Sequence, residues 1–337
     1  MIYPKSIKAG DNIGVVAPSS GIVDELKIKR LDSAITNFNK RGYNIIESNN
    51  VRTDINGQSD IAGNRAKQFM DMYLNDNISC IIAACGGDFL IEMLPYINFE
   101  KISRSNPKWI QGFSDITGII FPITTICDIA TIYSENFGVY GMNQWHKSLE
   151  NSLKILEGKD IIQNSFDMYQ DGFGDLENNI TFEYNLSKKT KWINLNGEDI
   201  IDIQGRLIGG CLDVLTTLVG TKYDNVSNYI EKYKDDKILW YLESCELTGE
   251  QIIRGLFQLK EAGWFKYASG FVFGRYGSYT SSNGIDYYDT IKRSLNKLNL
   301  PIIVDVDIGH KPPQLAIING VKAKIVCKNS KGILYYI

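Results

Sequence analysis

Polar or glycine residues follow apolar runs at four places in the 337-residue chain. These residues are the pair Gly86 and Gly87, Ser114, Glu243 and His310. A serine, a histidine and a carboxylate can act as nucleophile, base and orienting group, in any order along the chain. Backbone N–H groups at a glycine turn can stabilise an oxyanion. The four places together are therefore compatible with acyl-transfer chemistry.

Each of these residues also has a purely structural explanation. The glycine pair could form a plain tight turn, and Ser114 and Asp115 could cap the helix that follows them. The segment around Ser114 reads GFSDIT, so Ile116 stands where a G-x-S-x-G nucleophile elbow has its second glycine. Glu243 could be the first polar residue of a loop, and a lone histidine is usually structural. The local patterns leave both explanations open.

Histidine content limits the chemistry further. The chain has two histidines, His146 and His310, which leaves almost no room for a histidine-rich metal site. His310 follows the apolar run IIVDVDI and opens the segment HKPP, whereas His146 lies in the polar segment NQWHKSLE. Any general-base histidine must therefore be one of these two, and the position of His310 at the end of an apolar run favours it.

Composition and charge exclude several classes of protein. Lys and Arg number 36 against 39 Asp and Glu, a net charge of −3, which argues against a nucleic-acid surface. The six cysteines form no C-x-x-C pair, so we expect reduced, buried thiols. Neither a signal peptide nor an apolar run of membrane-spanning length is visible. These features predict a cytoplasmic protein that binds neither nucleic acid nor membranes.

Strands and helices alternate in the first part of the chain. Apolar runs predict strands at 12–18, 43–48, 78–87 and 108–113, and helical spacing predicts helices over 24–40 and 60–75. Such alternation is typical of a parallel sheet with helices on both faces, which binds ligands beyond the carboxyl ends of its strands. Gly87 and Ser114 are predicted at such ends.

A similar pattern returns after a polar stretch. Residues 161–200 are rich in Gly, Asn and Asp and are interpreted as a connector with short β segments. Strands are then predicted at 237–246, 268–277 and 301–310, helices over 248–264 and 285–298, and a hairpin that turns at Asn319-Gly320. Glu243 and His310 lie at or near the ends of two of these strands.

Seven segments, spread over nearly the whole chain, resemble the LD-carboxypeptidase family, serine peptidase family S66. They are GDNIGVVAPSSG, the GGD turn followed by LPYI, GFSDIT, GRLIGGCLDVL, LWYLES, SGFVFGRYG and DVDIGHKPPQLAIINGVKAKI. This family includes murein tetrapeptide carboxypeptidases and microcin C immunity peptidases of the MccF type. The resemblance implies an α/β fold with a mostly parallel N-terminal sheet domain (1–160), a connector (161–200) and a C-terminal α/β domain (201–337). It also implies an active site at the domain interface.

The resemblance further assigns roles. It implies that Ser114 is the nucleophile, His310 the general base and Glu243 the residue that orients it. Backbone N–H groups of Gly87 and Asp115 would form the oxyanion hole. Family members are typically cytoplasmic homodimers without metal or cofactor, so the same is expected of this chain.

Four further residues are expected near the substrate: Gly86, Trp192, Cys211 and Arg275. Cys211 stands where the family's GGNL turn has Asn, so contacts there should differ, unless the thiol is itself reactive. Trp192 could stack on a nucleobase, as an aromatic connector residue does in the microcin-immunity branch, or pack between domains. Arg275 or Arg206 could bind the terminal carboxylate of a murein tetrapeptide.

Three functions remain open on these grounds. The first is release of the terminal D-Ala from murein tetrapeptide, and the second is cleavage of aminoacyl- or peptidyl-nucleotide antibiotics. The third is binding of peptides without catalysis. A nucleotide-binding domain is disfavoured, because neither a P-loop nor G-x-G-x-x-G follows the first strand.

Overall fold

The computed structural model describes residues 1–172, 174, 177–198 and 200–337 and divides into two units. Unit 1 comprises Met1–Asp160 and Phe173–Tyr184, and unit 2 comprises Ile161–Gly172 and Asn185–Ile337. The stretch expected as a connector is thus shared between the units. Two short strands of this stretch pair with the sheet of unit 2, which explains why it is not a free linker.

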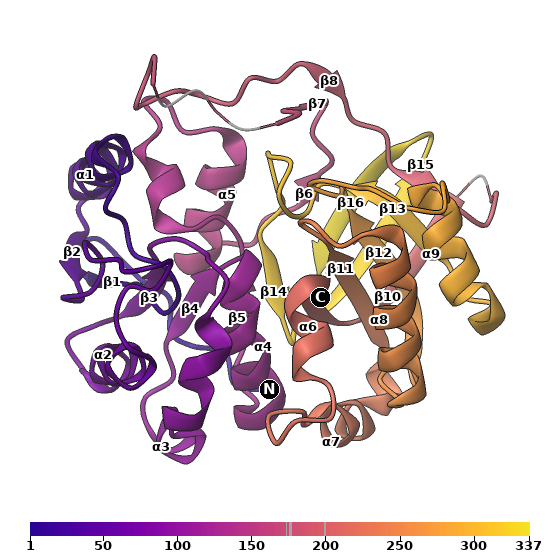
Figure 1. Ribbon diagram of the computed structural model, residues 1–337, viewed down its shortest axis with the longest axis horizontal. Coiled ribbons are helices and arrows are strands. Elements are labelled where there is room, and N and C mark those ends of the chain that lie inside the picture. The colour runs from indigo at the N-terminus through magenta and orange to yellow at the C-terminus, as the bar shows by residue number, and fades with distance from the viewer. Residues whose placement is uncertain (173, 175–176, 199) are drawn as a thin grey trace. The chain divides into compact units, whose positions relative to one another are not determined.

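Unit 1 is a parallel sheet with helices on both faces. The strand order within the unit is β5-β4-β3-β1-β2, and the adjacent strands pair in parallel. Figure 1 shows α1 and α5 over one face and α2, α3 and α4 over the other. The strands are β1 (Asn12–Val16), β2 (Asn44–Glu47), β3 (Cys80–Ala83), β4 (Trp109–Gly112) and β5 (Thr131–Tyr133), and the helices are α1 (Glu25–Lys40), α2 (Ala62–Leu74), α3 (Phe99–Arg104), α4 (Thr117–Cys127) and α5 (Lys147–Leu156).

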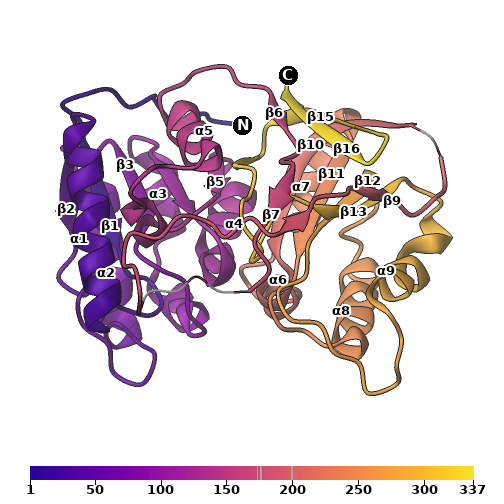
Figure 2. The same ribbon diagram turned by 90° about the horizontal axis from the view of Figure 1, so that it is seen from above.

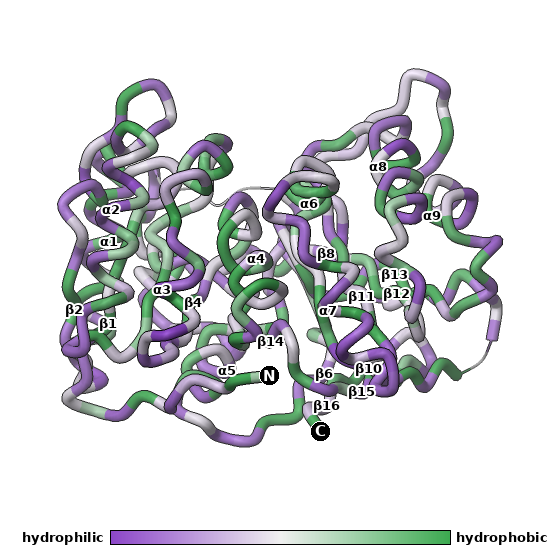
Figure 3. Tube along the Cα trace, turned by 90° about the horizontal axis from the view of Figure 1, so that it is seen from below, coloured by the Kyte–Doolittle hydropathy of each residue, from purple (hydrophilic) through white to green (hydrophobic). Residues whose placement is uncertain are grey.

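Local sequence explains these elements. Strands β3 and β4 are buried at every position, as expected for central strands covered on both faces. Helix α1 begins where the Asp24 carboxylate accepts the Lys27 N–H, and it buries Leu31, Ala34 and Phe38 at helical spacing. Figure 3 shows α4 as mostly hydrophobic, in keeping with the burial of nearly all its residues. The prediction of a parallel α/β domain is confirmed.

Unit 2 contains a mixed sheet with the order β6-β16-β15-β10-β11-β12-β13-β9. Strands β10 to β13 pair in parallel, and the outer pairs are antiparallel. Helices α6, α8 and α9 gather over one face of this sheet (Figure 2). The strands are β6 (Gln163–Asn164), β7 (Met168–Tyr169), β8 (Lys188–Lys189), β9 (Ile193–Asn194), β10 (Ile200–Cys211), β11 (Ile238–Glu243), β12 (Ala268–Gly274), β13 (Ile302–Val306), β14 (Ile317–Asn319), β15 (Lys322–Lys328) and β16 (Lys331–Tyr336), and the helices are α6 (Leu212–Leu218), α7 (Val226–Lys232), α8 (Gly249–Glu261) and α9 (Tyr287–Leu295).

The C-terminal hairpin differs from the prediction. It is formed by β15 and β16, and it turns at Asn329 and Ser330 instead of Asn319-Gly320. A two-residue turn of this kind needs positive φ at both central residues. Asn329 and Ser330 have φ of 52° and 59°, whereas at the predicted turn only Gly320 has a positive φ.

Membrane insertion by a helix finds no support in the described part of the chain. None of its helices combines the length and the apolar character that crossing a bilayer requires.

Candidate active site

Ser114 occupies a strained turn between β4 and α4. It opens a single 3-10 turn, Ser114–Ile116, and its φ of 63° lies in the left-handed region that non-glycine residues rarely adopt. Such a conformation costs about 1–3 kcal/mol and is typical of functional sites, including strand-to-helix nucleophile elbows. Neither this turn nor α4 has a side-chain cap. The capping role considered for Ser114 is therefore not observed.

Side chains from the end of β5 and beyond support this turn. Asn136 Oδ1 accepts the Phe113 N–H at 3.2 Å, and the Tyr133 hydroxyl accepts the Ser114 N–H at 3.3 Å. A Cβ at Gly112 would lie 2.9 Å from Asn136 Oδ1, so this close approach requires glycine. Sequence analysis missed Tyr133 and Asn136. Their signal was the same as at the other positions: polar groups at the end of a short apolar run.

The Gly86-Gly87 turn lies against Ser114. A Cβ at Gly86 would be 3.3 Å from Ser114 Oγ, so position 86 borders the hydroxyl directly. Gly87 has φ of 146°, and a Cβ there would lie 2.4 Å from both Ser19 Oγ and Ser20 Oγ. Among the described residues, none accepts a hydrogen bond from the Gly87 N–H. Because no described residue accepts from it, the Gly87 N–H could donate to an oxyanion.

Asp115 has a structural side chain and a backbone that could serve the site. Its carboxylate accepts the Ser19 hydroxyl at 2.5 Å and the Leu90 N–H at 2.9 Å. Burial raises the pKa of this carboxyl, and the two hydrogen bonds oppose that rise. The Asp115 N–H lies in the first turn of a helix, where N–H groups have no intrahelical acceptor. Unit 1 thus brings together Gly86, Gly87, Ser114 and Asp115.

Unit 2 contains a histidine–carboxylate pair in which the carboxylate is buried and the histidine is half-buried. His310 Nδ1 lies 2.8 Å from Glu243 Oε2, and the Glu243 side chain is fully buried at the end of β11. Because an ionised carboxylate only accepts hydrogen bonds, Nδ1 must carry the proton. In the neutral imidazole, Nε2 then presents a lone pair that can accept a proton.

The surroundings of the pair set the basicity of the imidazole. Burial by itself would lower the pKa of His310, but the Glu243 carboxylate and a contact with Cys245 outweigh it, so the pKa stands well above its ordinary value. Gly309 packs on the carboxylate, with a φ of 94° and a hypothetical Cβ 2.4 Å from Glu243 Oε2. A side chain at position 309 would therefore collide with the Glu243 carboxylate, so this position requires glycine.

Cys211 lies beside Glu243 as its register partner at the ends of β10 and β11. Its thiol is buried, and burial followed by the Glu243 charge raises its pKa well above the ordinary value. A protonated thiol does not fit the reactive role weighed for Cys211. Sequence analysis missed Asp213, whose carboxylate accepts the N–H groups of Cys245 at 3.2 Å and Glu246 at 3.1 Å.

Trp192 does not fit the stacking role that was one of the two considered for it. Its side chain is 1% exposed, and its indole N–H donates to Asp307 Oδ2 at 2.8 Å. A Cβ at Gly332 would lie 1.9 Å from the ring, so the β16 backbone rests against the indole. Because the ring is enclosed within unit 2, it offers no face to a nucleobase.

The arginines considered for a substrate carboxylate are engaged elsewhere. Arg275 is 4% exposed and pairs with Asp307 at 2.7 Å. Arg206 is similarly buried and pairs with Asp236. The structure therefore does not support either of them as a carboxylate-binding residue, since both already bind a protein carboxylate.

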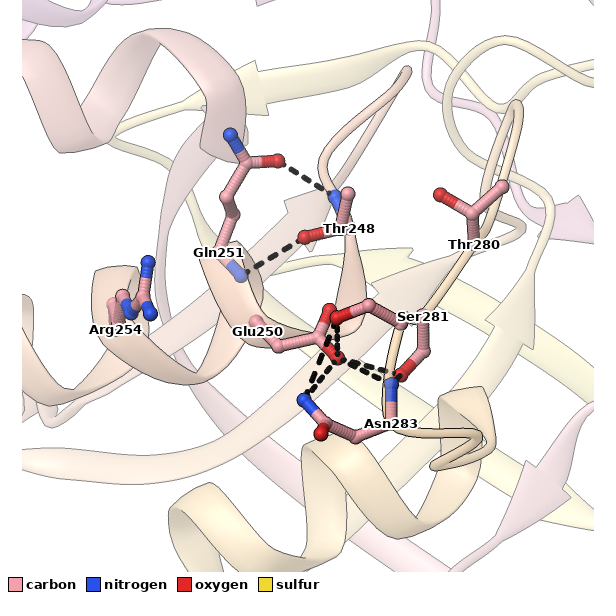
Figure 4. A pocket seen from close by; sticks show the side chains of 8 residues that line it. Thr248, Glu250, Gln251, Arg254, Thr280, Ser281 and Asn283 are labelled. Carbon is pink, nitrogen blue, oxygen red and sulfur yellow. Dashed lines mark hydrogen bonds between the residues drawn. The ribbon is translucent and has the colours of Figure 1, made fainter.

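A polar hollow of about 620 Å³ opens beside the start of α8 (Figure 4). There Glu250 accepts hydrogen bonds from Ser281 Oγ at 2.8 Å, Ser282 Oγ at 3.1 Å and Asn283 Nδ2 at 2.9 Å. These bonds fasten the loop before α9 to the first turn of α8. None of the sequence-predicted site residues lines this hollow.

Two family models match the chain. The LD-carboxypeptidase N-terminal domain model matches residues 13–134, and the LD-carboxypeptidase C-terminal domain model matches residues 204–325. Together they cover well over half of the sequence. Ser114 lies within the first match, and Glu243 and His310 lie within the second.

Curated relatives and solved structures agree with these matches. The chain is 25% identical to the "Probable murein peptide carboxypeptidase" of Bacillus subtilis, over 95% of this chain and 90% of that protein. It is 24% identical to the microcin C7 self-immunity protein MccF of Escherichia coli, over 95% and 91% of the two chains. A structure of MccF in the wild-type apo state aligns with a TM-score of 0.84 at 22% identity, covering 100% of this chain and 99% of that one. Another structure holds MccF in complex with aspartyl sulfamoyl adenosine, with a TM-score of 0.82.

Proposed function

Because the chain belongs to the LD-carboxypeptidase family and is a serine carboxypeptidase, we propose that Ser114, Glu243 and His310 form its catalytic triad. The proposed substrate is a murein tetrapeptide, from which the enzyme releases the terminal D-Ala. The observation that carries the proposal is the Glu243–His310 pair: Nδ1 lies 2.8 Å from Glu243 Oε2, which makes Nε2 the basic nitrogen of the neutral imidazole.

The mechanism assigns one task to each group. His310 Nε2 takes the proton of Ser114 Oγ, which attacks the carbonyl carbon of the scissile amide. The N–H groups of Gly87 and Asp115 bind the resulting oxyanion. His310 then gives its proton to the leaving amine, and a water molecule, activated by the same imidazole, releases the acyl group. Glu243 stabilises the imidazolium throughout.

This mechanism sets a geometric requirement. Ser114 Oγ and His310 Nε2 must come within about 2.6–3.2 Å of each other in the substrate complex. The two groups belong to different units, so the proposal requires an active site that both units complete. A cytoplasmic location and a homodimer are also part of the proposal, on the strength of the family resemblance alone.

Aminoacyl- or peptidyl-nucleotides are the second candidate substrates. The observation in their favour is the similarity to MccF of Escherichia coli over nearly the full length of both chains. The enclosed Trp192 speaks against the same mode of base recognition at that position. A nucleotide would therefore need another aromatic or polar partner in this protein.

A paired assay separates these candidates. Purified enzyme is given an L,D-linked murein tetrapeptide ending in D-Ala and, separately, an aminoacyl sulfamoyl adenosine. Release of D-Ala alone supports the proposal, and cleavage of the sulfamoyl adenosine alone supports the second candidate. Ser114→Ala protein serves as the control, and hydrolysis at the wild-type rate by this variant would refute the triad.

A further inference from the structure

A buried arginine holds the segment that follows His310. Arg275 comes directly after β12, and its Nη2 donates to the carbonyl of Lys311 at 2.9 Å and to that of Pro313 at 3.2 Å. These carbonyls lie one and three residues beyond the histidine. One planar guanidinium therefore forms hydrogen bonds with two main-chain carbonyls close to the proposed base, His310.

The guanidinium is itself fixed in place. Asp307 Oδ1 accepts from Arg275 Nη1 at 2.7 Å, while Oδ2 accepts the Trp192 indole N–H at 2.8 Å and the Phe166 N–H at 3.2 Å. The Tyr169 ring covers the guanidinium carbon at 4.5 Å. Since both charged groups are shielded from water, leaving either one without its partner would be costly. The pair therefore has one strongly preferred geometry.

The rest of the segment is also held by hydrogen bonds. The Pro312 carbonyl accepts the Gln170 N–H at 2.8 Å, and the Leu315 N–H donates to the Asp307 carbonyl at 2.7 Å. Three consecutive carbonyls, at 311, 312 and 313, thus have partners. For two of these three, the Arg275 side chain is the only donor among the described residues.

We propose that Arg275 is a positioning residue for His310. It acts through the main chain of residues 311–313, which fixes where the histidine Cα lies and hence how the imidazole meets Glu243. The 2.8 Å bond between His310 and Glu243 leaves little tolerance for movement of that backbone. This inference rests on the proposed function, because it takes His310 to be the catalytic base.

Arg275→Lys is the variant that tests the proposal. Lysine keeps a positive charge for Asp307, but its single ammonium group cannot hold two carbonyls in the same plane. A displacement of about 1 Å at a catalytic group can cost about 10²-fold in rate. We expect kcat to fall by about that factor while KM changes little.

Arg206→Lys is the matched control. Arg206 is also buried, pairs with Asp236, donates to the Gly320 carbonyl and stacks on Tyr233. However, it lies at the start of the β10–β11 pairing, five residues before the level of Glu243, or about 16 Å along the strand. This variant should lose stability but keep kcat and the titration of His310.

A second measurement does not depend on turnover. The chain has two histidines, so the His310 imidazole signal can be followed by NMR with His146 as the internal reference. In Arg275→Lys the pKa of His310 should fall toward its ordinary value, because the imidazole loses its close carboxylate partner. If this variant does not fold, Tyr169→Leu, which removes only the covering ring, should show a smaller fall of kcat and pKa in the same direction.

The outcomes distinguish this inference from the function it rests on. If Arg275→Lys, or Tyr169→Leu in its place, keeps the wild-type kcat and His310 titration while His310→Ala is inactive, Arg275 has no positioning role and the triad stands. If Arg206→Lys produces the same changes as Arg275→Lys, the effect is a general loss of stability, and the inference is also overturned. Wild-type activity in His310→Ala would refute the proposed function itself.

Discussion

The two units build their parts of the candidate site by different means. In unit 1 the candidate site depends mainly on backbone conformation: Ser114 has a positive φ, and Gly86 borders its hydroxyl. In unit 2 the candidate site depends on ionisable side chains that are largely shielded from water, in the Glu243–His310 contact and the Arg275–Asp307 contact. The part of the site in unit 1 requires glycines, because a side chain there would collide with its neighbours. The part in unit 2 requires charged groups that are shielded from water.

This difference predicts two kinds of sensitivity. A backbone-built part should respond to an added methyl group and should be insensitive to pH. A part built from buried charges should respond to the loss of a single charge and should set the pH dependence of the reaction. Four substitutions test this contrast.

Glu243→Gln should have the largest effect, a loss of about 10³–10⁴-fold in kcat, because the imidazolium loses its stabilising charge. The base acts when neutral, so the rate rises as pH increases through the pKa of His310, which stands above its ordinary value. Without the carboxylate, burial lowers that pKa, and the rise should move to lower pH. A pH–rate profile measures both changes, and an unmoved rise would contradict the assignment of His310 as base.

Gly309→Ala should cost about 10²-fold in kcat, because the new Cβ would lie 2.4 Å from Glu243 Oε2 and must displace the carboxylate. The pH–rate profile should shift in the same direction as in Glu243→Gln. Steady-state kinetics at several pH values provides the check. Wild-type rates in this variant would show that the close Gly309 contact has no role.

Gly86→Ala should cost about 10-fold in kcat, since its Cβ would lie 3.3 Å from Ser114 Oγ and press on the nucleophile without removing it. The pH–rate profile should keep its wild-type position, which distinguishes the two units. Gly138→Ala is the matched control in unit 1, because its Cβ would make only an ordinary 3.6 Å contact. A shifted pH–rate profile in Gly86→Ala would contradict the claim that only unit 2 sets the pH dependence of the reaction.

Trp192→Phe should lower the free energy of unfolding by about 1–3 kcal/mol, because Asp307 loses a buried hydrogen-bond donor, and it should leave KM unchanged for both substrate classes. Urea denaturation and kinetics on both substrate classes measure the two quantities. A raised KM for the sulfamoyl adenosine alone would restore a ligand-binding role for this residue.

Much of the fold could be predicted from the sequence. The apolar runs around β1, β3 and β4 indicated their strands, because central strands of a parallel sheet are buried at each position. Short β segments were expected within 161–200, but the strands with which they pair could not be predicted, because those partners are far away in the chain. The hairpin turn was misplaced because Asn329-Ser330 is a weaker turn signal than Asn319-Gly320.

For the candidate site as well, some features could be predicted from the sequence and others could not. The positions of Ser114 and Glu243 at or just beyond strand ends followed from local patterns, whereas His310 lies in the loop beyond β13, which ends at Val306. The proposed roles of all three came from the family resemblance. The roles of Trp192 and Arg275 did not follow, because both depend on Asp307, which is distant from each of them in the sequence. A buried ion pair leaves no periodic signal, so an arginine near a motif is easily taken for a ligand-binding residue.

Labelling with a serine-directed phosphonate tests the central claim most directly, namely that His310 of unit 2 activates Ser114 of unit 1. The account predicts one adduct per chain, mapped to Ser114 by peptide mass spectrometry, and labelling slowed by at least about 10²-fold in His310→Ala. Equal labelling of Ser114→Ala protein, or an unchanged rate in His310→Ala, would contradict it.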